Sequence, residues 1–261
     1  PKKPMRRILI LILLCTVALA GCSGGKDLEL LTADEDARQL YERASSALNG
    51  ARFDIAIQHF QSLEARYPFS PYALQGQLDM AYAYFRNNRP EEAISEADRF
   101  IRFNPTHPNV DYAYYIKGLS NFAHRKRFLH KWFPRDPSQF DQKALHDAFN
   151  DFSQLVRRFP NSKYAADAHQ RLIFIRNLLA RHEIKVANYY LSRKAWVAAA
   201  NRANNVLQTF HDTPANEEAL VILVRSYREL GLTESYQKAL NTLRLNYPGN
   251  DYLTEISREK S

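Results

Sequence analysis

The sequence is poor in the residues that form disulfides and tight turns. Its two cysteines, Cys15 and Cys22, both lie near the N-terminus, so the rest of the chain has no thiol for a disulfide or for nucleophilic catalysis. Glycine is scarce as well, with 8 in the whole chain. Alternating apolar segments bounded by glycine-rich turns are missing, which argues against a sheet and favours helices.

Motifs for enzyme chemistry are also missing. The stretch His182-Glu183-Ile184-Lys185-Val186 begins like the zinc motif H-E-x-x-H, but Val186 cannot bind a metal. Gly21 to Lys26 resembles a phosphate-binding loop only in part, and no G-x-S-x-G motif occurs. The 8 histidines are scattered without ligand spacing. We therefore expect neither an enzyme nor a metal site.

The apolar run Ile8–Ala20 is too short to span a membrane, because it has 13 residues and a spanning helix needs roughly 20. It follows four basic residues and ends in small ones, which is typical of a bacterial secretory signal. Leu19-Ala20-Gly21-Cys22 resembles the lipobox, which implies cleavage after Gly21 and acylation of Cys22. The alternative is an ordinary signal peptide in which the cysteine is incidental.

This predicted anchor indicates the compartment. Cys22 would carry N-palmitoyl and S-diacylglycerol groups, whose several acyl chains give a stable membrane attachment, and no other cofactor is expected. The next residue is Ser23, where an aspartate would resemble an inner-membrane retention signal, so we expect the outer membrane and its periplasmic face. Residues 1–21 are then a cleaved signal peptide, and 22–32 form a lipidated tether.

The positive charge of the chain does not predict nucleic-acid binding. The formal net charge is +8, but four of the positive charges lie in the predicted signal, which leaves about +4 in the mature body. A basic surface favours nucleic acid only where the two meet, and the predicted compartment argues against that.

Similar short stretches end several amphipathic runs. A small polar residue and a helix start follow most of them, and a proline disfavours helix in the residue before it. Counted between the prolines and His211, their spacing is 37, 55, 51 and 37 residues, which fits helical hairpins of about 34 residues with two insertions. The stretches are Arg66-Tyr67-Pro68, Phe103-Asn104-Pro105, Arg158-Phe159-Pro160, Thr209-Phe210-His211 and Asn246-Tyr247-Pro248.

The tetratricopeptide repeat matches this pattern. It places small residues where the two helices of a hairpin approach closely, followed by an aromatic residue and a proline. Five repeats fit, with His211 in place of the fourth proline and Tyr236 in place of an alanine in the degenerate fifth. The matching residues are Ala44, Ala56, Phe60 and Pro68; Ala81, Tyr84, Ala93 and Pro105; Gly118, Ala148, Phe152 and Pro160; Ala187, Tyr190 and Ala199; and Tyr227, Leu240 and Pro248.

The predicted fold is all-α, with about ten helices in five tetratricopeptide-like repeats that form a superhelical solenoid. A generic helical bundle is the alternative. Repeats one to three occupy 33–160 with an insertion at 124–138, a long linking helix and repeats four and five occupy 161–248, and 249–261 is a C-terminal tail. The predicted helices cover 33–49, 52–66, 72–87, 90–103, 109–124, 139–158, 162–193, 195–210, 215–230 and 233–246.

Such a repeat stack binds ligands on the face formed by the first helix of each hairpin. Tyrosine offers an apolar ring with a polar tip, which suits an extended peptide rich in aromatic residues. The alternative is that these tyrosines pack between hairpins. The residues that the register places on this face are Tyr41, Asp79, Tyr82, Arg86, Tyr112, Tyr115 and Phe122.

The insertion 124–138 combines basic and aromatic residues. Its sequence from His124 to Pro137, HRKRFLHKWFPRDP, contains five lysines or arginines and three large aromatics. It is either a solvated loop whose aromatics pack on repeat three, or a contact surface for a protein or for anionic lipid headgroups. Both interpretations stay open.

Five stretches contain residues that the repeat pattern alone does not require. They are Arg66–Tyr72, Asp98–Asn109, Arg135–Pro137, Phe159–Ser162 and Ala195–Ala198. They resemble the BamD (ComL) family of outer-membrane assembly lipoproteins, and the resemblance covers nearly the whole chain. It implies a periplasmic component of the β-barrel assembly machinery that binds unfolded outer-membrane proteins, accessory Bam lipoproteins, and BamA through its membrane-proximal POTRA domain.

The resemblance also implies roles for individual residues. By position, Tyr67 and Phe69 fall in the family's N-terminal substrate-recognition region. Arg193 and Arg202, on either side of Trp196, fall in the C-terminal region that meets the POTRA domain. His211 replaces a repeat proline beside that region, which puts the local geometry in question.

A rival function from another class would use the same repeats. The protein would then be a lipoprotein that regulates peptidoglycan enzymes or DNA uptake by holding an enzyme or a pilus component. Depletion separates the two hypotheses, because only the assembly role predicts a loss of folded outer-membrane barrels.

Overall fold

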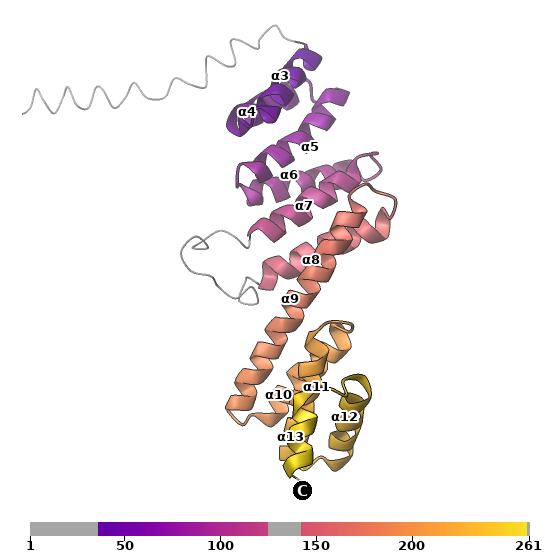
Figure 1. The fold of residues 1–261 in the computed structure, drawn as a ribbon. Coiled ribbons are helices and arrows are strands. Elements are labelled where there is room, and N and C mark those ends of the chain that lie inside the picture. Colours follow the sequence, from indigo (N-terminus) through magenta and orange to yellow (C-terminus); the bar gives the residue numbers. More distant parts are fainter. Residues whose placement is uncertain (1–35, 125–141, 260–261) are drawn as a thin grey trace, which may run out of the picture. The chain divides into compact units, whose positions relative to one another are not determined.

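The described parts of the chain are helical throughout. A computed structural model describes residues 36–124 and 142–259, so Cys22, the tether and most of the insertion 124–138 lie outside the described residues. Eleven α-helices occupy these two ranges (Figure 1): α3 (Ala37–Asn49), α4 (Phe53–Arg66), α5 (Pro71–Arg86), α6 (Pro90–Phe103), α7 (Val110–His124), α8 (Gln142–Arg158), α9 (Ala165–Ser192), α10 (Trp196–Thr209), α11 (Ala215–Glu229), α12 (Thr233–Asn246) and α13 (Asp251–Glu259).

The ten helices predicted from the sequence are present with closely similar bounds, and α9 is the long one that was expected. The eleventh, α13, lies in the stretch 249–261 that the sequence analysis assigns to a tail. Tyr252 and Ile256 lie one turn apart on α13, and both are buried. This helix therefore packs on the folded body, which corrects the expectation of a simple tail. Among the described residues, no helix is both long and apolar enough to cross a membrane.

Four hairpins turn in the same way. In each, a residue just after the first helix adopts a left-handed backbone, and the next amide bonds to the carbonyl five residues earlier, which is a Schellman ending. Three of these left-handed residues are not glycine, so the repeated turn overrides their local preference. The left-handed residues are Ala51, Asn88, Lys194 and Gly231, and the amide–carbonyl pairs are Arg52–Ala47, Arg89–Tyr84, Ala195–Tyr190 and Leu232–Tyr227.

The linkers that follow the hairpins share a second pattern, with one exception. In four of them an amide bonds to the carbonyl three residues earlier, at 3.0–3.1 Å: Ser70 to Tyr67, His107 to Asn104, Ser162 to Phe159, and Asn250 to Tyr247. The linker that contains His211 differs, because Asp212 has φ of 61° and the Thr213 hydroxyl donates to the Phe210 carbonyl at 2.9 Å. Replacement of the proline thus accompanies a changed turn.

Small residues sit where the paired helices approach, as the repeat pattern predicts. At Gly118 on α7 a Cβ would lie 2.7–2.9 Å from ring atoms of Phe152 on α8, and Phe152 is itself fully buried. The alanines at the other predicted positions have no exposed surface: Ala44, Ala56, Ala81, Ala93, Ala148, Ala187 and Ala199.

The chain divides into two compact units, and the division falls between Glu96 and Ala97 inside α6. In the first unit, α3 packs against both α4 and α5. In the second, α9 packs against α8, α10 and α11. The predicted grouping into 33–160 and 161–248 describes repeats rather than compact units, and it stays a prediction.

Replacing Gly118 with alanine should destabilise the second unit, because the new methyl group overlaps the Phe152 ring. Overpacking of this kind costs about 1–3 kcal/mol, and urea unfolding followed by circular dichroism measures it. Gly249→Ala is the matched control, since a Cβ there has no neighbour within 4 Å. Adding Phe152→Leu to Gly118→Ala should recover part of the loss, and an unchanged midpoint for Gly118→Ala alone would contradict the close approach.

Candidate functional site

One face of α5 carries the predicted groove residues Asp79, Tyr82 and Arg86. The spacing of Tyr72, Gln75, Asp79, Tyr82 and Arg86 alternates between three and four residues, so all five lie along one side of the helix. Tyr72 and Arg86 are exposed and the other three are half-buried, whereas the opposite side of α5 is part of the core. We call this stripe the α5 face.

Tyr41 on α3 contacts the α5 face through a carboxylate. Its hydroxyl donates to Asp79 Oδ2 at 2.8 Å, and Gln75 Nε2 donates to Asp79 Oδ1 at 3.0 Å. The Tyr41 ring lies 6.1 Å from that of Phe60 and 5.7 Å from that of Tyr72. The structure therefore brings the predicted Tyr41 and Asp79 together and adds Tyr72 and Gln75, which the sequence analysis missed.

Burial is the main cause of the pKa shifts of Tyr41 and Asp79. It raises the pKa of Tyr41 to about 12, with the Asp79 charge adding to the effect. Burial also raises the pKa of Asp79 above its ordinary value, although the Tyr41 and Gln75 hydrogen bonds oppose the shift. In the described part of the chain, no lysine or arginine forms an ion pair with Asp79.

Arg86 and Tyr82 form the other end of the α5 face. Arg86 Nη1 donates to the Tyr82 hydroxyl at 2.6 Å. The guanidinium also lies 5.3 Å from the Phe53 ring centroid and 5.6 Å from that of Tyr82, within the range of cation–π attraction. These contacts hold an exposed positive charge in a fixed position.

The two residues predicted by family resemblance lie in the linker before α5. Tyr67 is half-buried, and its amide donates to the Leu63 carbonyl at 2.9 Å to cap α4. Phe69 is 97% exposed. An aromatic ring left in water gains nothing for the fold, so Phe69 is available to a partner.

In the second unit, the predicted tyrosines of α7 pack against the start of α9. The rings of Tyr112 and Tyr115 stack on Tyr164, with centroids 5.0 Å and 4.7 Å apart. The Tyr115 hydroxyl donates to Asp167 Oδ2 at 2.8 Å, and Arg171 forms an ion pair with the same carboxylate. Burial raises the pKa of Tyr115 to about 12, with the Asp167 hydrogen bond adding to it. These contacts match the alternative in which tyrosines pack between hairpins.

Phe122 continues the same contact. Its ring meets that of Phe174 edge-on at 6.0 Å, and the Arg171 guanidinium lies 5.7 Å from its centroid. Asp167 differs from Asp79 in its charge balance. Burial acts to raise the pKa of Asp167, but the Arg171 and Tyr115 hydrogen bonds outweigh burial and lower it.

Two of the predicted partner-binding residues, Arg193 and Trp196, lie at the turn between α9 and α10. Arg193 is exposed, and its guanidinium lies 5.5 Å from the ring centroid of Tyr189, which is 57% exposed. Trp196 begins α10 and is half-buried, and beside it Val197 is 59% exposed. Exposed apolar side chains next to a cation are typical of a protein interface, and the sequence analysis missed Tyr189 and Val197.

Arg202 is held by an ion pair within the unit. Its Nη1 lies 3.2 Å and 3.1 Å from the two carboxylate oxygens of Glu183 on α9. The Glu183 side chain is mostly buried and that of Arg202 is partly exposed. The Glu183 hydrogen bond, more than any other contact, raises the pKa of Arg202. The guanidinium therefore keeps its charge at the surface while one nitrogen is fixed.

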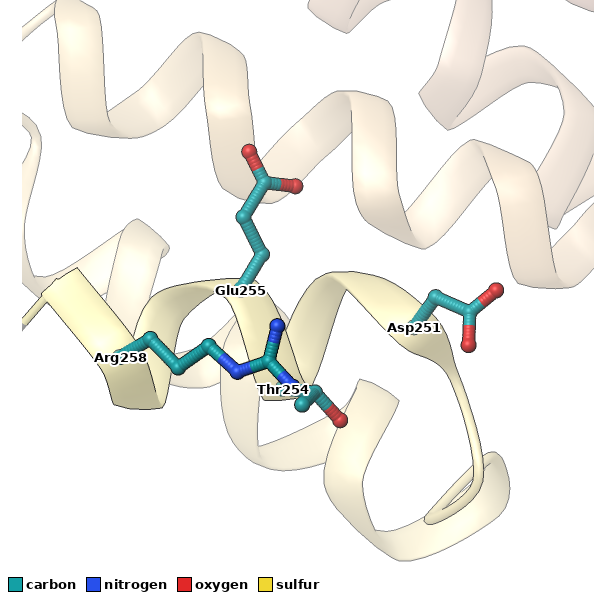
Figure 2. A pocket seen from close by; sticks show the side chains of 4 residues that line it. All are labelled: Asp251, Thr254, Glu255 and Arg258. Carbon is teal, nitrogen blue, oxygen red and sulfur yellow. The ribbon is translucent and has the colours of Figure 1, made fainter.

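A pocket on α13 carries none of the predicted residues. Figure 2 shows its four lining side chains along one helix, with Glu255 directed away from the others. Glu255 lies 3.5 Å from Arg225 of α11. The lining residues combine opposite charges and no aromatic ring: Asp251, Thr254, Glu255 and Arg258. The described residues also contain no group of three or more His, Cys, Asp or Glu side chains that could hold a metal ion.

Comparison with known proteins identifies relatives along nearly the whole chain. A family model named YfiO and described as an outer membrane lipoprotein matches residues 33–243. Proteins named outer membrane protein assembly factor BamD are similar: that of Neisseria meningitidis serogroup A is 39% identical over 96% of this chain and 94% of its own. Those of Vibrio cholerae and Haemophilus influenzae are each 37% identical, over 90% and 88% of this chain and 96% and 87% of their own.

Solved structures add little to these findings. The crystal structure of MamA protein aligns with a TM-score of 0.40 and 16% identity, over 81% of this chain and 94% of that chain. A similarity at this level does not bear on function.

Asp79→Asn and Asp167→Asn should change the pH dependence of stability in opposite directions. Each asparagine keeps an oxygen that accepts the tyrosine hydroxyl. The folded-state pKa of Asp79 is raised, so its stabilising contribution is full below the unfolded pKa of about 3.9 and is lost as the pH rises. Asp79→Asn should therefore gain stability relative to the wild type as the pH increases from about 4 to 7.

The folded-state pKa of Asp167 is lowered, so its contribution is present above the unfolded pKa and is lost as the pH falls. Asp167→Asn should lose stability relative to the wild type at neutral pH, and this loss should shrink in acid. Urea unfolding at several pH values measures both differences. Parallel pH profiles for the two variants would contradict the charge assignments.

Proposed function

This chain belongs to the YfiO (BamD) family of outer membrane lipoproteins, and from that premise we propose that it is a non-catalytic scaffold and receptor of the β-barrel assembly machinery. It would bind BamA, accessory Bam lipoproteins and unfolded outer-membrane proteins, and it would be anchored through acylated Cys22 at the periplasmic face of the outer membrane. The observation that carries the proposal is the family match over residues 33–243, nearly the whole helical body.

The α5 face and Phe69 suit the binding of extended, aromatic-rich substrate. Tyr72 and Phe69 expose aromatic rings, and Tyr82 and Arg86 add a polar tip and a fixed positive charge nearby. Unfolded outer-membrane strands alternate apolar and polar residues, so they offer rings and hydrogen-bonding groups at regular intervals. Tyr112, Tyr115 and Phe122 remain proposed contacts, although their rings already have partners, namely Tyr164 just before α9 and Phe174 on it.

The turn between α9 and α10 suits the docking of the BamA POTRA domain. Tyr189 and Val197 offer exposed apolar surface, and Arg193 and Arg202 offer positive charge on either side of Trp196. Aromatic residues and arginines dominate the energetics of protein interfaces, which supports this assignment.

Depletion of the protein in its own organism should lower the amount of folded outer-membrane porins, because their assembly would lack its receptor. Heat-modifiable migration of porins on gels measures the folded fraction, and re-expression of the wild-type chain is the control. Normal porin levels together with altered wall cross-linking or DNA uptake would overturn the proposal in favour of the rival lipoprotein function.

Arg202→Glu should weaken the capture of BamA by about tenfold, because it reverses a charge at the proposed interface. The change also places a carboxylate beside Glu183, so it disturbs the unit as well as the interface. Glu183→Gln is the matched control, since it breaks the same ion pair but keeps the Arg202 charge. Pull-down from detergent extracts measures the binding.

We expect Glu183→Gln to retain BamA and Arg202→Glu to release it. Equal losses in both variants would assign Arg202 to the stability of the α9–α10 packing. Full binding after reversal of both Arg193 and Arg202 would show that the interface lies elsewhere.

A further inference from the structure

Two tyrosine–carboxylate pairs join the first helices of successive hairpins, one pair in each unit. Tyr41 donates to Asp79, and Tyr115 donates to Asp167, both at 2.8 Å. The two tyrosines occupy the same repeat position, three residues before the small residues Ala44 and Gly118. The pairs are therefore internal counterparts, and they can be compared directly.

They differ in the charge that balances the carboxylate. Arg171 lies one helical turn after Asp167 and forms an ion pair with it. One turn after Asp79 the chain has Ala83, which is fully buried, and one turn before it has the neutral Gln75. Asp79 is thus a half-buried carboxylate that receives hydrogen bonds from two neutral groups and has no ion-pair partner in the described residues.

A carboxylate in this position has capacity for a further donor. Its two oxygens together accept about four hydrogen bonds, and Tyr41 and Gln75 supply two. A charged donor forms a stronger bond than a neutral one and offsets the cost of partial burial. A metal ion fits poorly, because the described residues contain no cluster of three acidic or histidine side chains.

The neighbouring rings favour a basic side chain as the missing partner. Tyr72 is exposed and lies beside Tyr41, and half-buried Tyr82 is one turn further along the α5 face. Aromatic faces attract lysine and arginine side chains, and their edges pack on the aliphatic stems. The α5 face therefore offers a carboxylate that contacts Tyr41, with the ring of Tyr72 beside that of Tyr41.

We propose that Asp79 is the specificity-determining residue of the α5 face, and that it binds a lysine or arginine side chain of an extended polypeptide lying across α3 and α5. The inference rests on the proposed function, which assigns polypeptide binding to this face. It adds the chemistry of selection: an aromatic-rich segment with a basic residue at the Asp79 position binds in preference to one that has a neutral or acidic residue there.

Fluorescence anisotropy with the full chain tests this directly. The probes are short labelled peptides with alternating tyrosine and phenylalanine, in which one lysine is moved through the internal positions. Sister peptides replace that lysine with norleucine or glutamate. The wild type should bind the best lysine peptide about tenfold more tightly than its norleucine counterpart, as expected for one charge-assisted hydrogen bond.

Three variants locate the effect. Asp79→Asn keeps the acceptor for Tyr41 and should bind the lysine and norleucine peptides equally. Gln75→Lys supplies the missing cation from within α5 and should also remove the preference, with no loss of folding stability. Asp167→Asn, the internal counterpart, should keep the wild-type preference. Urea unfolding of each variant confirms that the fold is retained.

The outcomes separate the inference from the function on which it rests. If the wild type binds no peptide, polypeptide binding by this face is wrong, and the inference fails with it. If the peptides bind but Asp79→Asn keeps the lysine preference, the face binds polypeptide and Asp79 does not select the basic residue. If Asp167→Asn removes the preference instead, the selecting carboxylate lies in the second unit.

Discussion

The close approach of the two helices in each hairpin is the constraint on which the rest of the structure depends. Small residues permit it: a Cβ at Gly118 would overlap the ring of Phe152, and Ala44 and Ala81 at the same repeat position are fully buried. On α7 this contact occupies one side of the helix. On α5 the side that is not part of the core stays partly exposed, and the candidate functional residues Asp79 and Tyr82 lie on it.

Much of this arrangement follows from the sequence, because it depends on local signals. Ten helices were predicted from the prolines and small polar residues that end each amphipathic run. The small apolar residues within the helices identified the repeat. The same logic could have found α13: Tyr247-Pro248 repeats the stretch before α5, and the Asn250 amide bonds back to Tyr247 as Ser70 does to Tyr67. The helix was missed because it is short.

The partners of the predicted side chains were harder to find, because they depend on distant contacts. Tyr115 and its acceptor Asp167 are 52 residues apart, and no local pattern joins them. Part of the signal was present all the same. Tyr164, Asp167, Arg171 and Phe174 repeat the alternating spacing of the α5 face, and an aspartate one turn before an arginine is a common helical pair. Glu183 gave no such signal, since its contact with Arg202 joins two helices.

The aspartates of this fold differ in whether a lysine or arginine lies beside the carboxylate. This difference separates the aspartates that serve packing from the one proposed to bind a ligand. Asp151 is 3% exposed and is balanced by Lys117, whose Nζ lies 3.2 Å from it and 2.8 Å from Asp98. Burial works against the Lys117 charge, but the two aspartates outweigh burial and raise its pKa. Asp167 is likewise balanced by Arg171.

Asp151 and Asp167 each have a cationic partner within the fold, so a basic ligand would have to compete with that partner to bind them. Asp79 is half-buried and has no such cation among the described residues. Leaving a half-buried carboxylate to neutral donors costs folding free energy, because burying a charge without a counter-charge is unfavourable. The Tyr41 and Gln75 hydrogen bonds offset part of that cost, and a positive charge from a ligand would offset more of it. Tyr112 and Tyr115 of α7 thus already have packing partners in the next hairpin, whereas Asp79 on the α5 face has only neutral partners among the described residues, which supports the binding proposed there.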